Sequence, residues 1–398
     1  MIAADRPARR AARLAVIDAQ GGIRHARRTD LAHRFAPGDL VVANDAATLP
    51  ASLTGIHCRT HAPIEMRLAA WIKAGDPTRF TAVAFGAGDH RTRTQDRPQP
   101  PPLAVGDRLA LGPLVAVIDA MLDHPRLVRL HFTGSRAAIF DGLARHGRPI
   151  QYAHVPAPLA LWDVWTGIAA APLAFEAPSA GFALDWRTIT AWRRRGVGFA
   201  TVTHAAGISS TGDAALDRQL PFDEPYHIPA STAAAIAAAK ARRGRIVAIG
   251  TTVVRALESA SIGNGVHAGS GVARGRIGRE TPLRIVDAIL TGVHEPGESH
   301  FELLQAFADD AVLSKAVATL AGQAYHSHEF GDVMLLPVIG RPVTGKRPRV
   351  PALTKRNNHC QARYGEATAC ASAHQACERP AVRDCRGPAG LAMTGARQ

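Results

Sequence analysis

A glycine followed by two threonines, Gly250-Thr251-Thr252, combines groups that can bind an anion or a sugar. The apolar residues before this triplet and the helical spacing after it predict a turn between a strand and a helix. Backbone N–H groups at the start of a helix attract negative charge, and two hydroxyl groups can hydrogen bond to a ribose. An ordinary capped turn can have the same composition, so both interpretations stand on this segment alone.

The residues on either side predict the elements that position this turn. Residues 246–249 form a short apolar run, as in a strand buried on both faces, and residues 253–259 have apolar residues at helical spacing. An Ala-rich helix is predicted upstream, with Ser231 as its N-cap. Together they form an α/β crossover, which predicts a parallel sheet with the turn at the carboxyl end of a strand, where such sheets bind ligands.

The length and composition of the chain limit the kinds of protein it can be. Its 398 residues, 46% hydrophobic and 20% charged, suffice for two domains with a sizeable core. No uncharged apolar run approaches the roughly 20 residues of a membrane span, and the first residues lack a secretory signal, so we expect a cytoplasmic protein with no membrane contact. A formal net charge of +14 suits a nucleic-acid partner, although an arginine-rich proteome explains it equally well.

Residues 52–149 have a different pattern of apolar and turn-forming residues from the rest of the chain. Gly, Pro and Asp residues separate short alternating apolar runs at 64–68, 80–85, 108–111, 114–118 and 127–132. Regular short strands of this kind predict a small antiparallel β-barrel domain inserted at 52–149. The remaining residues, 1–51 and 150–340, are predicted to form one discontinuous α/β domain with a mostly parallel sheet.

No metal site is expected from the sequence. Residues 341–398 are rich in Pro, Arg, Ala and Cys without periodicity, which predicts a disordered basic tail. Its four cysteines are separated by nine, six and seven residues and lack the C-x₂-C pairs of zinc ribbons. The run His326-Ser327-His328-Glu329 is not an HExxH motif and is interpreted as surface polar residues.

The segment GTTVVRALES, residues 250–259, resembles the GTTSVRxLES motif of the S-adenosylmethionine:tRNA ribosyltransferase-isomerases of queuosine biosynthesis. Other segments resemble this family in the same order along the chain. Residues 178–181, PSAG, resemble its PTAG motif, residues 286–291 resemble its VDALxT motif, and residues 325–334 resemble its YRFFSYGDAM motif. The resemblance extends over residues 7–337.

This resemblance implies a fold and a reaction. In the family, a β-barrel is inserted into an α/β domain. The ribosyl group of S-adenosylmethionine is transferred to 7-aminomethyl-7-deazaguanine in tRNA and isomerises, which gives epoxyqueuosine and releases adenine and methionine. S-adenosylmethionine is then a consumed cosubstrate, no separate cofactor is implied, and tRNA is the macromolecular partner.

The family motifs also imply two sets of site residues. The residues suited to proton transfer are His204, Glu224 and His294. The residues that would bind or orient the substrate are Asn44, Asp45, Ser179, Gly181, Gly250, Thr251, Thr252, Arg255, Glu258 and Asp332. Structural alternatives remain, because Arg255 and Glu258 have the i,i+3 spacing of a helix ion pair and His204 could be a buried structural histidine.

Four polar residues of the family motifs are replaced in this chain. The family has Arg, Arg, His and His at the positions of Ala47, Ser52, Ala183 and Phe222. Polar groups preorganised around a reacting substrate contribute much of the rate of an enzyme. A divergent paralogue that binds S-adenosylmethionine, a nucleoside or RNA without this activity is therefore the alternative prediction.

Overall fold

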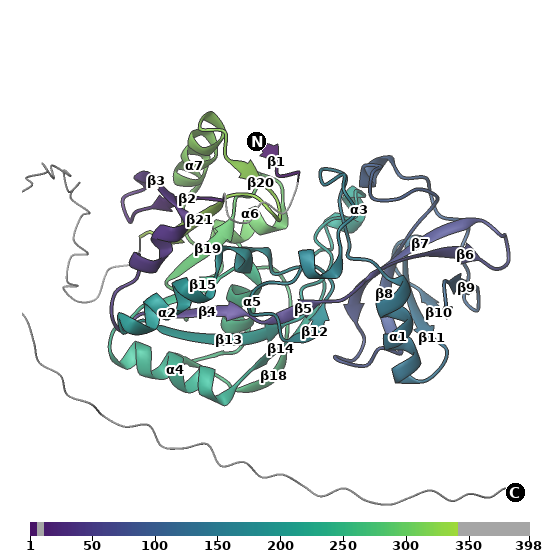
Figure 1. The fold of residues 1–398 in the computed structure, drawn as a ribbon, viewed down its shortest axis with the longest axis horizontal. Coiled ribbons are helices and arrows are strands. Elements are labelled where there is room, and N and C mark those ends of the chain that lie inside the picture. The colour runs from purple at the N-terminus through teal and green to yellow at the C-terminus, as the bar shows by residue number, and fades with distance from the viewer. Residues whose placement is uncertain (6–11, 341–398) are drawn as a thin grey trace, which may run out of the picture. The chain divides into compact units, whose positions relative to one another are not determined.

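The computed structural model describes residues 1–5 and 12–340, so the predicted tail at 341–398 lies outside the described residues. The described chain combines a large sheet, covered by helices, with a closed β-barrel (Figure 1). This arrangement confirms the predicted fold class, an α/β domain with an inserted antiparallel barrel. The domain limits at residues 51/52 and 149/150 stay a prediction.

The large sheet has nine strands among the described residues. In spatial order they are β18 (Gly269–Ala273), β14 (Glu224–Ile228), β13 (Gly198–His204), β4 (Leu40–Asn44), β15 (Ile246–Ile249), β19 (Ala288–Gly292), β21 (Val333–Pro337), β2 (Arg13–Ile17) and β3 (Ile23–Arg27). The central strands β13, β4, β15 and β19 are parallel to one another, as the crossover predicted. Antiparallel pairs flank them on both sides, so the sheet is mixed rather than mostly parallel.

The barrel closes in the order β10-β11-β8-β7-β6-β9, and all of its neighbouring strands are antiparallel. Its strands are β6 (Ser52–His57), β7 (Pro63–Trp71), β8 (Arg79–Phe85), β9 (Arg108–Leu111), β10 (Leu114–Met121) and β11 (Leu127–Phe132). The apolar runs predicted every strand except β6. In β6, the polar residues Ser52 and Thr54 and the glycine Gly55 leave no alternating apolar pattern in the sequence.

Helices and short strands complete the described chain. The helices are α1 (Arg136–His146), α2 (Trp186–Arg194), α3 (Ala214–Asp217), α4 (Ala230–Ala241), α5 (Thr251–Ser259), α6 (Ser299–Leu304) and α7 (Asp310–Gly322), with 3₁₀ turns η1 (Arg28–His33), η2 (Thr94–Asp96), η3 (Leu161–Asp163) and η4 (Ser179–Ala183). Two-stranded pairs are β1 (Ile2–Ala3) with β20 (His326–Ser327), β5 (Ala46–Thr48) with β12 (Ala171–Ala174), and β16 (Ser261–Ile262) with β17 (Gly265–Val266). Within the described ranges, no helix has the length and hydrophobicity needed to cross a membrane.

The start of α4 differs from its prediction. Pro229 is the N-cap residue, at φ −58°, and the helix begins at Ala230, so Ser231 lies inside the first turn. Proline has its φ fixed near the helical value and is well suited to starting a helix. The side chain of Ser231 was therefore not needed as a cap.

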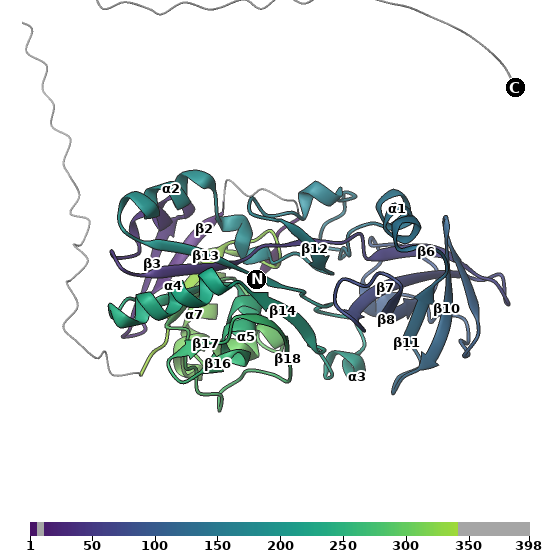
Figure 2. The same cartoon turned by 90° about the horizontal axis from the view of Figure 1, so that it is seen from below.

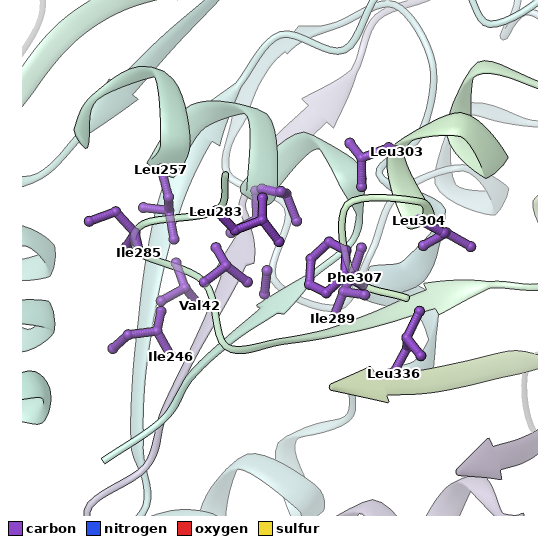
Figure 3. Packing of buried hydrophobic residues seen from close by; sticks show 14 of the residues in the cluster. Val42, Ile246, Leu257, Leu283, Ile285, Ile289, Leu303, Leu304, Phe307 and Leu336 are labelled. Atoms are coloured by element: carbon purple, nitrogen blue, oxygen red, sulfur yellow. The ribbon is translucent and has the colours of Figure 1, made fainter. Parts of the chain in front are cut away.

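Two apolar layers cover the sheet. On one face, Val42, Ile246 and Ile289 from the central strands pack with Leu257 of α5 and Phe307 after α6 (Figure 3). On the other face, alternate residues of the same strands pack with residues of α2. Figure 2 shows α2 and α5 on opposite sides of the sheet. Every residue of β4 and β15 is buried, which explains the apolar runs at Leu40–Ala43 and Ile246–Ile249.

Gly55 lies where β6 and β9 approach each other closely in the barrel. A Cβ atom at this position would lie 2.0 Å from the carbonyl oxygen of Ala110 on β9, so the backbone would have to move. We expect Gly55→Ala to reduce the free energy of unfolding by about 1–3 kcal/mol, as overpacking does. The matched control is Gly265→Ala, because the nearest heavy atom there is 3.9 Å from the added Cβ. Thermal unfolding of the two variants is the measurement, and equal midpoints would contradict the prediction.

Candidate functional site

A cavity of about 680 Å³ lies beyond the carboxyl ends of the central parallel strands. Its wall includes residues that follow β13, β15 and β19, among them Gly207, Thr252 and His294. Its volume falls in the range of small-molecule sites, and its position is the one at which open α/β sheets bind ligands. Of the predicted site residues, Ser179, Glu224, Gly250, Thr251, Thr252, Arg255 and His294 line it.

The turn after β15 is held from two sides. Gly250 has φ +90°, a conformation that glycine adopts without strain, and its N–H donates to the carbonyl oxygen of Leu290 at 2.8 Å. Helix α5 then begins at Thr251. The buried side chain of Asn44 donates to the hydroxyl oxygen of Thr252 at 3.3 Å and to the carbonyl oxygen of His204 at 2.9 Å. Asn44 therefore joins the ends of β4 and β13 to the turn.

Glu224 is the centre of a buried polar cluster. Its carboxylate accepts from Arg255 Nε at 2.9 Å and from the backbone N–H of Gly207 at 2.7 Å. Arg255 also donates to the carbonyl oxygens of Phe222, Ala273 and Gly275. Arg255 thus bonds to Glu224 of β14 and to carbonyl oxygens near β14 and β18. The alternative of a helix ion pair with Glu258 is not observed.

His204 is fully buried beside this cluster. Its Nε2 lies 3.4 Å from Glu224 Oε2, yet within the described chain neither ring nitrogen has a hydrogen-bond partner. Burial, with a smaller contribution from Arg255, lowers the pKa of His204 to about 4, against the opposing effect of Glu224. The imidazole is neutral at pH 7 and is a weak base there.

Glu176 is a cavity residue that the sequence analysis missed. Its carboxylate accepts a hydrogen bond from the hydroxyl group of Tyr152, and both residues line the cavity. Burial raises the pKa of Glu176 to about 7, although hydrogen bonds from Ser209 and Tyr152 oppose the rise. A carboxyl group that titrates near neutral pH is suited to acid–base catalysis. A single Glu in a loop belongs to no motif or periodic pattern, so the sequence did not indicate Glu176.

Imidazole and carboxylate groups also form the side of the cavity near α6. His294 Nε2 lies 3.1 Å from the hydroxyl oxygen of Thr291, and its Nδ1 lies 3.4 Å from Glu298 Oε2. The ring of His300 stacks on His294 with 4.9 Å between centroids. Burial and the neighbouring His294 lower the pKa of His300 to about 4. The sequence indicated His294 alone among these groups.

Besides Asn44, four predicted substrate-binding residues are outside the cavity wall and hold nearby structure instead. Asp45 accepts from the Thr203 hydroxyl group at 2.6 Å, and Asp332 pairs with Arg13 at 2.9 Å. Glu258 accepts backbone N–H groups of residues 284–286. Gly181 leaves room for Thr166, whose Cγ2 would be 2.8 Å from an added Cβ.

The four positions where family residues are replaced are not in the cavity wall either. Ala47 and Ala183 are buried, and Phe222 packs against the apolar cluster of the barrel. Ser52 donates to Glu65 of β7 at 2.8 Å. The cavity keeps its own polar groups despite these replacements.

The interpretation of residues 326–329 as surface polar residues is wrong for three of them. His328 and Glu329 line the cavity, and Glu329 Oε2 lies 2.9 Å from His154 Nε2. Ser327 is buried, and the imidazole of His326 alone is largely exposed, at 51%. The chain folds residues 154 and 329 together across 175 positions, so local sequence could not reveal this contact.

The chain is similar to known proteins over most of its length. A family model described as queuosine biosynthesis protein matches residues 1–336. The S-adenosylmethionine:tRNA ribosyltransferase-isomerase of Sorangium cellulosum is 34% identical over 361 residues, which cover 83% of this chain and 93% of that protein. The protein of the same name from Thiobacillus denitrificans is 31% identical, with 82% and 91% covered. A crystal structure of an S-adenosylmethionine tRNA ribosyltransferase from Thermotoga maritima aligns with a TM-score of 0.44 at 24% identity and covers 84% of this chain and 96% of that chain.

The buried neutral His204 predicts a loss of stability in acid. An unfolded His has a pKa of 6.5, so between pH 6.5 and about 4 the unfolded chain binds a proton that the folded chain does not. Stability present above pH 6.5 is therefore lost as the pH falls through this window, by about 2 kcal/mol from pH 7 to pH 5. Urea unfolding at both pH values should show a smaller loss in His204→Gln. The control is His326→Gln, and an identical loss in both variants would contradict the prediction.

Proposed function

The chain belongs to the queuosine biosynthesis protein family, and we propose that it is an S-adenosylmethionine-dependent tRNA ribosyltransferase-isomerase. The reaction transfers the ribosyl unit of S-adenosylmethionine to 7-aminomethyl-7-deazaguanine in tRNA. The unit isomerises, giving epoxyqueuosine with release of adenine and methionine. The observation that supports this most is family membership over residues 1–336, together with a cavity of small-molecule size that is lined by the turn Gly250–Thr252.

The first chemical requirement is a base. The sulfonium group acidifies the C5′ protons of the ribose, and a group with a pKa near neutrality is the most effective acceptor for such a proton. Glu176, with its pKa raised to about 7 chiefly by burial, has this property. The pKa of His204, lowered to about 4, makes it less suitable. We therefore assign proton abstraction to Glu176 rather than to His204.

The methionine carboxylate requires a cationic or N–H-rich partner. Arg255 already donates to Glu224 and to three carbonyl oxygens, so its guanidinium is committed to the fold. The start of α5 offers backbone N–H groups and the hydroxyl groups of Thr251 and Thr252 to the cavity. We assign binding of the carboxylate or of the ribose hydroxyls to this turn.

Departure of adenine requires a proton donor. His294 faces the cavity, with Glu298 3.4 Å from its Nδ1. A carboxylate on one ring nitrogen stabilises the imidazolium form and fixes the ring. We assign protonation of the departing adenine to His294.

The tRNA requires a basic surface beside the cavity. The chain has a formal net charge of +14. Arg93, next to η2 in the barrel segment, lines the cavity and has an exposed side chain, whereas Arg276, after β18, lines it while bonded to Glu302 and to the carbonyl oxygens of Asp217 and Arg218. The guanidinium group of Arg93 suits a phosphate beside the modified nucleotide, and action on tRNA implies a cytoplasmic protein.

The direct test incubates the purified protein with S-adenosylmethionine and tRNA that carries 7-aminomethyl-7-deazaguanine. We expect adenine release together with epoxyqueuosine, measured by mass spectrometry of the nucleosides. If folded protein gives neither product while a curated relative turns over in the same assay, the proposal fails. Binding of S-adenosylmethionine without turnover would then favour the alternative of a divergent binding paralogue.

Glu176→Gln tests the assigned base. The amide preserves the shape of the side chain and can still accept from Tyr152, but it cannot take a proton. We expect kcat to fall about 10²–10⁴-fold, the usual contribution of a general base, and the acidic limb of the pH–rate profile near pH 7 to disappear. The control is Glu280→Gln, an exposed carboxylate outside the cavity wall. An unchanged pH profile in Glu176→Gln would remove Glu176 from this role.

A further inference from the structure

Two imidazoles and one carboxylate converge in the wall of the cavity. His154, His328 and Glu329 each offer one ligand atom, and these atoms lie within 4.8 Å of one another. His154 Nε2 and Glu329 Oε2 are 2.9 Å apart, and the rings of His154 and His328 stack with 4.6 Å between centroids. We propose that these three residues bind a divalent first-row transition metal ion, such as Zn²⁺, with its open positions toward the cavity.

The donor set has the composition of a catalytic rather than a structural metal site. Two imidazole nitrogens and one carboxylate oxygen bind Zn²⁺, Co²⁺ or Fe²⁺, and three protein ligands leave room for water or a substrate oxygen. Bonds of about 2.0–2.2 Å in tetrahedral geometry separate the ligand atoms by about 3.3 Å. The 2.9 Å separation of His154 Nε2 and Glu329 Oε2 is close to this value, and the ligand atom of His328 lies within 4.8 Å of both.

The backbone around His328 is fixed in an unusual conformation. His328 has φ +66°, in the left-handed region that non-glycine residues rarely adopt. Its carbonyl oxygen accepts from Gly331 N–H at 3.0 Å, and a Cβ on Gly331 would lie 2.5 Å from the carbonyl oxygen of His326. This tight turn places His328 and Glu329 side by side in the cavity wall, and strain of this kind is concentrated at functional sites.

The loop that carries His154 is fixed by Gln151. Its amide nitrogen donates to the carbonyl oxygens of Val155 and Ala157 at 2.6 and 2.7 Å. Its amide oxygen accepts from the N–H of Leu159 at 2.9 Å. Both segments that supply ligands are thus held by their own hydrogen bonds, so the site is largely formed before an ion binds.

A second carboxylate lies behind the third ligand. Glu298 Oε1 is 3.9 Å from His328 Nδ1, which leaves Nε2 of that ring for an ion. At 3.9 Å this carboxylate is beyond hydrogen-bond distance, so it contributes negative charge beside the imidazole, which favours a bound cation. The family motif YRFFSYGDAM has Phe and Ser where this chain has His328 and Glu329, so the cluster is a property of this chain and not of the motif.

The experiment measures metal binding by the full-length chain, independently of activity. Protein stripped with a chelator is loaded with Zn²⁺ or Co²⁺ and desalted, and its metal content is determined by mass spectrometry. We expect about one ion per chain at the cavity site, a Co²⁺ absorption spectrum without thiolate charge-transfer bands, and an affinity at least ten-fold lower in Glu329→Gln and His328→Gln. Circular dichroism checks that the variants are folded.

Two controls separate this site from other ligands in the chain. His326→Gln removes an imidazole two residues away that is outside the cavity wall, and it should bind as the unchanged protein does. Serine in place of Cys360, Cys370, Cys377 and Cys385 removes the thiols of the tail and should leave the Co²⁺ spectrum unchanged. Absence of bound ion, or equal affinity in Glu329→Gln, His328→Gln and His326→Gln, overturns the proposal.

Discussion

The carboxylate of Glu224 is the interaction on which the site depends. Glu224 begins β14, Arg255 lies on α5, and Gly207 follows β13, so one carboxylate connects three elements around the cavity. A buried charge must be compensated, and removal of one partner from a buried ion pair costs several kcal/mol because the other charge is left unpaired. Arg255 extends the connection to the carbonyl oxygens of Phe222 and Ala273. The antiparallel edge of the sheet is thereby attached to its parallel centre at the place where a ligand would bind.

Local sequence patterns predicted those parts of the structure that are determined locally. The apolar run at residues 246–249 and the glycine after it gave β15, the turn and α5, and alternating runs gave most of the barrel. The antiparallel edges were missed because strand direction depends on partners far away in the chain, as when β21 inserts beside β19. Ser231 was predicted as a cap because its side chain is suitable, whereas the ring of Pro229 had already fixed the helix start.

The candidate site was predicted only where family motifs carried the information. Glu224 and Arg255 are hydrogen bonded to each other, and Asn44 is hydrogen bonded to the backbone of the neighbouring His204, although the individual roles of these residues stay proposals. Glu176 lies in no motif, and Glu329 lies in the segment that resembles YRFFSYGDAM at a position where the family has Ser, so neither could be found in this way. Their significance comes from contacts with Tyr152 and His154, which only the folded chain creates.

Three carboxylates of the cavity, Glu176, Glu298 and Glu329, have different donors, and their proton affinities differ accordingly. Burial tends to raise the pKa of all three. For Glu298 and Glu329, hydrogen bonds from His294 and His154 outweigh burial, and both pKa values are lowered. For Glu176 the phenol of Tyr152 is a neutral donor, so burial prevails and the pKa rises to about 7. Ionised carboxylates that orient imidazoles thus lie in one cavity with a carboxyl group that exchanges a proton near neutral pH. Environments that separate the proton affinities of neighbouring groups are how a single site obtains both an acid and a base. Ala47, Ser52, Ala183 and Phe222, which replace the family's motif residues, lie outside this wall.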